Sequence, residues 1–188
     1  MGRRLRTWLE NANYVRFSIF AAAVAFITYF SMYAFRKPYA VASFADAGTV
    51  WGVGMKSAFV ISQTLGYAAS KFLGIKFVSE APRAHRAAAL VALIAAAELA
   101  LLMFAIAPGP WKLAAIALNG LPLGMVWGLV FSFLEGRRTS DALGAVLSAS
   151  FIMASGVVKS VGAQLLVRGV PEFWMPFATG LLFLPVAC

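Results

Sequence analysis

Two tyrosines and two cations share helical spacing where the first long apolar stretch of the sequence ends. The positions i, i+4, i+7 and i+8 are held by Tyr29, Tyr33, Arg36 and Lys37. These positions lie on one side of an α-helix, so the side chains form one cationic stripe if the helix continues past Phe35. Guanidinium groups bind phosphate or carboxylate oxygens in a bidentate manner, and ammonium groups add a point charge. The stripe therefore predicts an anion-binding site.

The two cations also have a second interpretation. Residues 17–35 could cross a bilayer alone, and Arg36 and Lys37 would then anchor the helix at the outer membrane surface. The tyrosines at matching helical phase and the apolar residues after Pro38 favour the buried alternative.

Lys71 lies inside the second apolar stretch. The uncharged run before it, residues 57–70, is too short to span a bilayer, so Lys71 lies at or within the inner boundary of the hydrocarbon. Gln63, Tyr67 and Lys71 are spaced i, i+4 and i+8, which places them on one helix face. Lys71 is thus a candidate for the anion site, and a lysine that extends to the cytoplasmic head groups is the alternative.

Two further ionisable residues lie within apolar stretches, where such residues are first considered functional. Lys159 separates residues 142–158 from residues 160–167, and it is either a substrate-binding cation or part of a structural ion pair. Glu98 lies midway along residues 87–107. It could be the partner of Lys159, a protonated packing residue or a proton-coupling site.

Two polar turns, residues 79–86 and 135–141, carry charges of both signs. They could bridge helices on the cytoplasmic side and so form a gate, although a solvated surface is the simpler interpretation. The gate residues would be Glu80, Arg83, Arg86, Glu135, Arg137 and Arg138.

The composition predicts an all-α membrane protein. Of 188 residues, 62% are hydrophobic and only 12% are charged, against about 25% charged in soluble domains. Residues 1–16 form a basic lead, and residues 17–188 form a six-helix transmembrane bundle. The expected helices are residues 17–44, 56–78, 87–107, 111–134, 142–167 and 173–188, with a kink at Pro38 and a loop over residues 45–55.

The basic residues also predict the topology. They concentrate in the lead and in the two polar turns, which places these segments and the N-terminus in the cytoplasm. Residues 173–188 are too few for a full span, so we expect the chain to stop within its sixth helix and to be a fragment of a longer protein.

Several classes of function are not expected. The net charge of +9 lies mostly at helix ends and in connections, where it meets lipid head groups, so no nucleic-acid partner is predicted. The one cysteine, Cys188, and the one histidine, His85, suggest no metal site, and no catalytic constellation or cofactor motif is present. We therefore do not expect an enzyme or a bound cofactor.

Two short segments resemble a known family. Tyr33-Ala-Phe-Arg-Lys-Pro-Tyr39 is similar to the first-helix motif of the organophosphate:phosphate antiporters, which include glycerol-3-phosphate and hexose-phosphate transporters. Gly66-Tyr-Ala-Ala-Ser-Lys-Phe72 is similar to their second-helix motif. The resemblance implies the N-terminal half of a twelve-helix major facilitator superfamily transporter, with the C-terminal half missing. It also implies that Arg36 binds the phosphate.

The resemblance implies that Lys37 and Lys71 add positive charge around the substrate. Two departures are evident. The family's fifth-helix histidine has no counterpart, and Lys159 is the nearest charged group. The superfamily signature between helices 2 and 3 is degenerate, which favours an uncharacterised branch with a different anion.

The expected function is secondary active transport of a small organic anion, with a phosphorylated anion favoured, by alternating access in the inner (plasma) membrane. Tyr33, Tyr67 and Lys159 would complete the substrate site formed by the three cations named above. Two alternatives are a transporter-like membrane sensor and a proton-coupled carrier of a non-anionic solute that uses Glu98.

Overall fold

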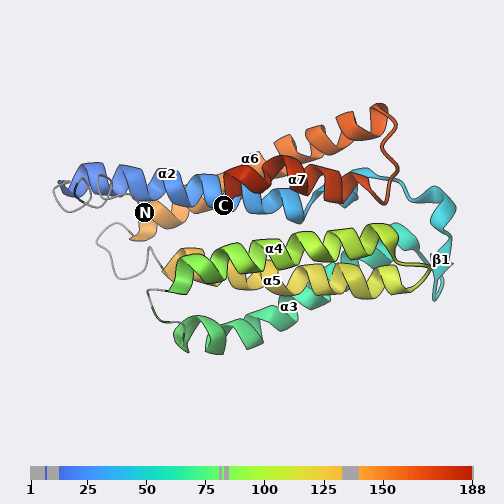
Figure 1. Ribbon diagram of the computed structural model, residues 1–188, viewed down its shortest axis with the longest axis horizontal. Helices are drawn as coiled ribbons and strands as arrows, with labels where there is room; N and C mark the ends of the chain where they lie inside the picture. The colour runs from blue at the N-terminus through green and yellow to red at the C-terminus, as the bar shows by residue number, and fades with distance from the viewer. Residues whose placement is uncertain (1–6, 8–12, 81, 83–84, 133–139, 188) are drawn as a thin grey trace.

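The computed structural model describes residues 7, 13–80, 82, 85–132 and 140–187 (Figure 1). The described part is almost entirely helical, which confirms the all-α prediction. Its α-helices are α2 (Tyr14–Met32), α3 (Met55–Glu80), α4 (Arg86–Ile106), α5 (Trp111–Ser132), α6 (Ser140–Val167) and α7 (Met175–Ala187).

Four described helical segments are long and apolar enough to cross a membrane. They are Val15–Phe35, Arg86–Ile106, Trp111–Val130 and Gly144–Val167. The α7 helix is apolar but shorter, and α3 is long but carries Lys56 and Lys71. The four segments identify the chain as an α-helical integral membrane protein.

The six described α-helices pack as two groups of three, and Figure 1 shows the two groups beside each other. In one group α2 packs with α6 and α7, and in the other α5 packs between α3 and α4. A contact between α4 and α7 joins the groups. The α3 and α5 backbones approach closely because Gly66 and Gly120 lack side chains. A methyl group at Gly66 would collide with the Ala117 carbonyl, and one at Gly120 would collide with the Gln63 carbonyl.

The expected helix over residues 17–44 is wrong in its second half. The α2 helix ends at Met32, and two 3₁₀ helices follow: η1 (Tyr33–Phe35) and η2 (Pro38–Val41). Pro38 has no N–H to donate, and its ring would clash with the carbonyl four residues earlier in a continuous α-helix. Pro38 instead occupies the first turn of η2, where its missing N–H costs nothing. The proline therefore ends the helix rather than kinking it.

The connection from η2 to α3 also differs from the expected loop over residues 45–55. A 3₁₀ helix, η3 (Ala45–Ala47), precedes two short antiparallel strands, β1 (Thr49–Val50) and β2 (Val53–Gly54). Thr49 lies opposite Gly54, and Val50 lies opposite Val53. Trp51 and Gly52 both have positive φ, as a tight two-residue hairpin turn requires.

Four phenylalanine rings pack together near the β1 end of the bundle. Phe44, Phe59, Phe104 and Phe173 form this aromatic cluster. The ring centroids of Phe59 and Phe104 are 4.9 Å apart, and Phe44 lies 5.1 Å from both Phe59 and Phe173. The rings come from the connection after η2, from α3, from α4 and from the segment before α7. The cluster therefore joins both helix groups.

Candidate anion-binding site

Arg36 lies in the break between η1 and η2, and it is half-buried. Its guanidinium carbon is 4.1 Å from the ring centroid of Tyr67 on α3 and 5.9 Å from that of Tyr33. The guanidinium group thus stacks on an aromatic face, which holds it without neutralising its charge. The Tyr33 ring itself stacks on Phe151 of α6, with centroids 6.0 Å apart and an interplanar angle of 15°.

Lys71 shares the Tyr67 ring with Arg36. Its ammonium nitrogen lies 5.4 Å from the Tyr67 centroid and 5.7 Å from the centroid of Trp127 on α5. The side chain of Lys71 is exposed, whereas that of Tyr67 is half-buried and that of Gln63 is buried. The side chains on the predicted face of α3 therefore become more exposed from Gln63 to Lys71. Trp127 was not predicted as a site residue.

Lys37 and Lys159 extend the positive charge toward α6. The charge of Lys37 is close enough to those of Arg36 and Lys159 for mutual repulsion. Lys159 is exposed and Lys37 is half-buried. We refer to Arg36, Lys37, Lys71 and Lys159 as the cationic cluster. Within the described ranges, no ion pair joins an acidic side chain to any of these four.

A buried polar network supports the backbone of Arg36. Because the helix is broken, Ala40 N–H donates to the Lys37 carbonyl, 3.1 Å away, and not to the Arg36 carbonyl, which would be its partner in a continuous helix. The Arg36 carbonyl instead accepts a hydrogen bond from Gln63 Nε2, at 3.2 Å. The α3 helix thereby satisfies a backbone group that the break exposes.

Gln63 connects this break to two other helices. Its Oε1 accepts a hydrogen bond from Tyr39 Oη at 3.0 Å, and its Nε2 donates to Asn119 Oδ1 at 2.7 Å. Asn119 Nδ2 in turn donates to the Ala97 carbonyl on α4, at 2.9 Å. Sequence reasoning placed Gln63 on the correct face but did not predict this network. The glycines of α5 indicate close helix packing, but the sequence does not show that the packing pairs Gln63 with Asn119.

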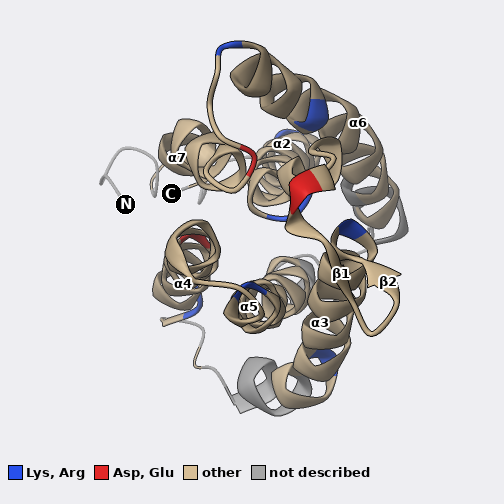
Figure 2. Cartoon of the chain, turned by 90° about the vertical axis from the view of Figure 1, so that its right-hand side faces the viewer, with Lys and Arg blue, Asp and Glu red and all other residues tan. Residues whose placement is uncertain are grey.

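Glu98 does not pair with Lys159. It is buried on the side of α4 that faces α7, and neither carboxyl oxygen has a hydrogen-bond partner within the described structure. The group opposite Glu98 is Gly180 of α7, where an added methyl group would collide with Oε2. Figure 2 shows α4 and α7 side by side at this contact. The ion-pair interpretation is therefore wrong, and the two other interpretations stay open.

Glu172 links the far side of the break to the start of α7. Its Oε1 accepts hydrogen bonds from Ser43 N and Ser43 Oγ, at 2.9 and 2.8 Å, and its Oε2 accepts one from Phe44 N at 2.8 Å. Burial raises the pKa of the Glu172 carboxyl, but these hydrogen bonds and the charge of Lys56 outweigh burial and lower the pKa. The carboxylate thus fixes the chain where it leaves η2.

The predicted cytoplasmic gate falls largely outside the described residues. Arg83, Glu135, Arg137 and Arg138 lie outside them, and only the backbone of Glu80 is described, at the end of α3. Arg86 begins α4 and is half-buried. The gate stays a prediction.

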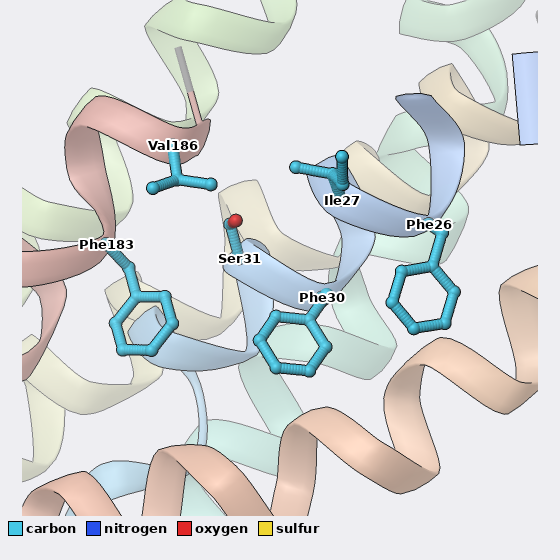
Figure 3. Close-up of a pocket in the computed structure, with 6 residues that line it drawn as sticks. All are labelled: Phe26, Ile27, Phe30, Ser31, Phe183 and Val186. Carbon is cyan, nitrogen blue, oxygen red and sulfur yellow. The ribbon is translucent and has the colours of Figure 1, made fainter. Parts of the chain in front are cut away.

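A separate apolar pocket of about 270 Å³ lies between α2 and α7 (Figure 3). Its lining residues are Phe26, Ile27, Phe30, Ser31, Phe183 and Val186. Ser31 Oγ is buried there without a hydrogen-bond partner in the described structure. None of these six residues is charged, so the pocket is distinct from the cationic cluster. Among the described residues, no three His, Cys, Asp or Glu side chains come together to hold a metal ion.

Comparison with known proteins gives one match. A family model with the description "Family of unknown function (DUF5690)" matches residues 38–188. No curated protein and no solved structure matches the chain. The matched range includes two of the four members of the cationic cluster, Lys71 and Lys159, and it also includes Gln63 and Glu98, whereas Arg36 and Lys37 lie just before it.

Proposed function

We propose that this chain, which belongs to that family of unknown function, forms one six-helix half of a secondary transporter for a small organic anion. A phosphorylated anion is the favoured substrate, and alternating access in the inner membrane is the mechanism. The observation that carries the proposal is the cationic cluster. Its four positive charges come from the α2 break, α3 and α6, and no described acidic side chain pairs with them.

The electrostatics of the cluster favour an anion as the missing partner. Positive charges held close together within a membrane protein repel one another and are costly to remove from water. Lys37 lies within range of both Arg36 and Lys159, so this repulsion is present without a substrate. An anion bound among these groups removes the repulsion and supplies the acceptors that guanidinium and ammonium groups require. Arg36 and Lys71 both contact the Tyr67 ring, so one anion could reach both side chains.

The broken first helix is a second supporting feature. Non-helical backbone at membrane depth occurs where it is enclosed by protein or lines a cavity, and discontinuous helices commonly form the substrate sites of transporters. The break between η1 and η2 carries Arg36 and Lys37 at its centre. Its Arg36 carbonyl is satisfied by Gln63, so the break is built into the packing of α3.

The sequence resemblance agrees with this site. It implies that Arg36 binds the phosphate and that Lys37 and Lys71 add positive charge around it, and these three residues are members of the cationic cluster. The two departures noted above, at Lys159 and in the polar turn before α4, favour an uncharacterised branch of this group, so glycerol 3-phosphate serves below only as one test anion of the class. The anion is therefore proposed as a chemical class and not as one compound.

Exchange of radiolabelled inorganic phosphate and glycerol 3-phosphate by the protein in liposomes tests the proposal. We expect Arg36→Ala to abolish exchange and Arg36→Lys to retain a small part of it, because lysine keeps the charge but loses bidentate binding. Arg168→Ala is the matched control, because Arg168 is exposed in the turn before α7 and lies outside the cluster. Exchange that is unchanged in Arg36→Ala would remove Arg36 from the site.

Binding without exchange would indicate a different function. If the protein binds either anion but moves neither across the liposome membrane, a membrane sensor replaces the transporter. Binding in detergent by isothermal titration calorimetry, measured on the same preparation, separates these two outcomes.

A further inference from the structure

Glu98 is a buried acid that the anion site does not use. It lies near the middle of α4, only 6% of its surface is exposed, and both carboxyl oxygens lack a hydrogen-bond partner in the described structure. A buried carboxylate without hydrogen bonds or a counter-charge is highly unfavourable, and within a membrane segment water cannot compensate. A neutral, protonated carboxyl group is the form that this position accommodates.

The elements packed against this part of α4 offer no cation to Glu98. The α7 helix contains no titratable side chain in its described residues, and η1 contributes only Tyr33. On α5, Lys112 donates to the carbonyls of Phe104 and Ala105, about two turns farther along α4. The other charged residue of α4 is Arg86, at the opposite end of the helix.

The surroundings of Glu98 are also shaped for a carboxyl group. Gly180 on α7 leaves room for the carboxyl oxygens, and a methyl group there would collide with Oε2. One helical position before Glu98, the Ala97 carbonyl is engaged by Asn119 Nδ2. The carboxyl group therefore lies in a fitted but apolar contact between α4 and α7.

This contact is one of the junctions between the two groups of three helices (Figure 2). Relative movement of the groups would separate α4 from α7 and admit water to Glu98. We propose that Glu98 is a proton-binding site that is protonated when α4 and α7 are packed and exchanges its proton with water when they separate. In that exchange the carboxyl O–H bond breaks, the proton passes to a water molecule, and the carboxylate remains.

Binding and release of this proton at Glu98 would couple proton movement to transport of the anion. This second step depends on the proposed function, because it requires that anion movement and separation of α4 from α7 are the same conformational change. The protonation of Glu98 does not depend on it. Two measurements therefore distinguish the proton site from the coupling.

Infrared spectroscopy of the protein in an ester-free detergent tests the proton site. At about pH 7 carboxyl groups with ordinary pKa values are ionised and lack the C=O stretch of the protonated acid. We expect such a band in the wild type, its loss in Glu98→Gln, and its retention in Glu172→Gln. Glutamine is isosteric with the protonated acid, so Glu98→Gln should fold. Glu98→Asp keeps a carboxyl group and should keep a shifted band. A band that is absent from the wild type, or unchanged in Glu98→Gln, would overturn the proposal.

Proton movement driven by inorganic phosphate in liposomes, followed with an internal pH-sensitive dye, tests the coupling. At matched phosphate flux we expect Glu98→Gln to lose the proton movement that the wild type and Glu172→Gln show. Equal proton movement in all three proteins would overturn the coupling and leave anion transport intact. A wild type that moves no phosphate would overturn the coupling together with the proposed function, and the infrared band would still decide whether Glu98 binds a proton.

Discussion

Replacing Gln63 by leucine should remove the support beneath Arg36. Gln63 makes two buried hydrogen bonds, with Tyr39 Oη at 3.0 Å and Asn119 Oδ1 at 2.7 Å, and a partly buried one to the Arg36 carbonyl at 3.2 Å. Side-chain hydrogen bonds within membrane proteins contribute about 0.6 kcal/mol each on average and at most about 1.7 kcal/mol. Three such bonds predict that Gln63→Leu lowers the free energy of unfolding by about 2 kcal/mol. The unsatisfied Arg36 carbonyl would add to this loss.

The control for this variant lies in the next residue of α3. Thr64 is exposed, and its hydroxyl donates only to the Val60 carbonyl of its own helix, at 2.7 Å. Thr64→Ala should therefore change the free energy of unfolding by less than about 0.5 kcal/mol. Reversible unfolding in mixed micelles, followed by circular dichroism, measures both variants.

A double-mutant cycle with Asn119→Leu isolates the Gln63–Asn119 bond. We expect a coupling free energy between about 0.5 and 1.7 kcal/mol. If Gln63→Leu is as stable as Thr64→Ala, or if the cycle shows no coupling, the polar network does not hold the Arg36 backbone. Anion binding should weaken in Gln63→Leu as well, because a displaced Arg36 no longer stacks on Tyr67.

Two further predictions concern the connections and the helix packing. Because the pKa of Glu172 is lowered in the folded protein, its ionised form adds stability above about pH 4, and this contribution is lost as the pH falls through the lower folded pKa. The free energy of unfolding of Glu172→Gln should therefore depend less on pH in that range. A pH dependence equal to that of the wild type would contradict this. Gly120→Ala should force α3 from α5 and lower the free energy of unfolding by about 1–3 kcal/mol, because a methyl group there meets the Gln63 carbonyl. The control is Gly156→Ala on α6, where no atom lies within 4 Å of the added methyl group. It should be neutral or raise the free energy of unfolding by up to about 1 kcal/mol. Equal effects of the two glycine substitutions would refute the close-packing argument.

The helices were predictable because length and hydropathy are local properties of the sequence. Alternating apolar runs and polar turns specify helical segments without any knowledge of their partners. The break after Met32 was only partly predictable. Pro38 signalled a disturbance, but whether a helix kinks or ends at a proline depends on what can satisfy the freed backbone groups. Here Gln63, on another helix, supplies that partner.

The candidate site was predictable to the extent that it follows helical periodicity. The i, i+4 spacing correctly placed Tyr67 and Lys71 on a face with Gln63, and Tyr29 packs edge-on against Tyr33 with centroids 5.8 Å apart. Contacts between distant segments were not predictable. Ser43 and Glu172 are 129 residues apart, and no periodic signal joins them. Pairing of this kind depends on the tertiary arrangement of the helices.

The position of Arg36 in a helix break also bears on the rate at which the site can rearrange. The backbone that carries a cation in the middle of a long helix moves only with the helix, and collective helix motions take microseconds to milliseconds. The η1–η2 segment is short, and the Arg36 carbonyl accepts one side-chain hydrogen bond, from Gln63. Rotation of a few backbone dihedral angles there is a local motion of nanoseconds to microseconds. The backbone at Arg36 can therefore adjust to the proposed anion well before the helices move.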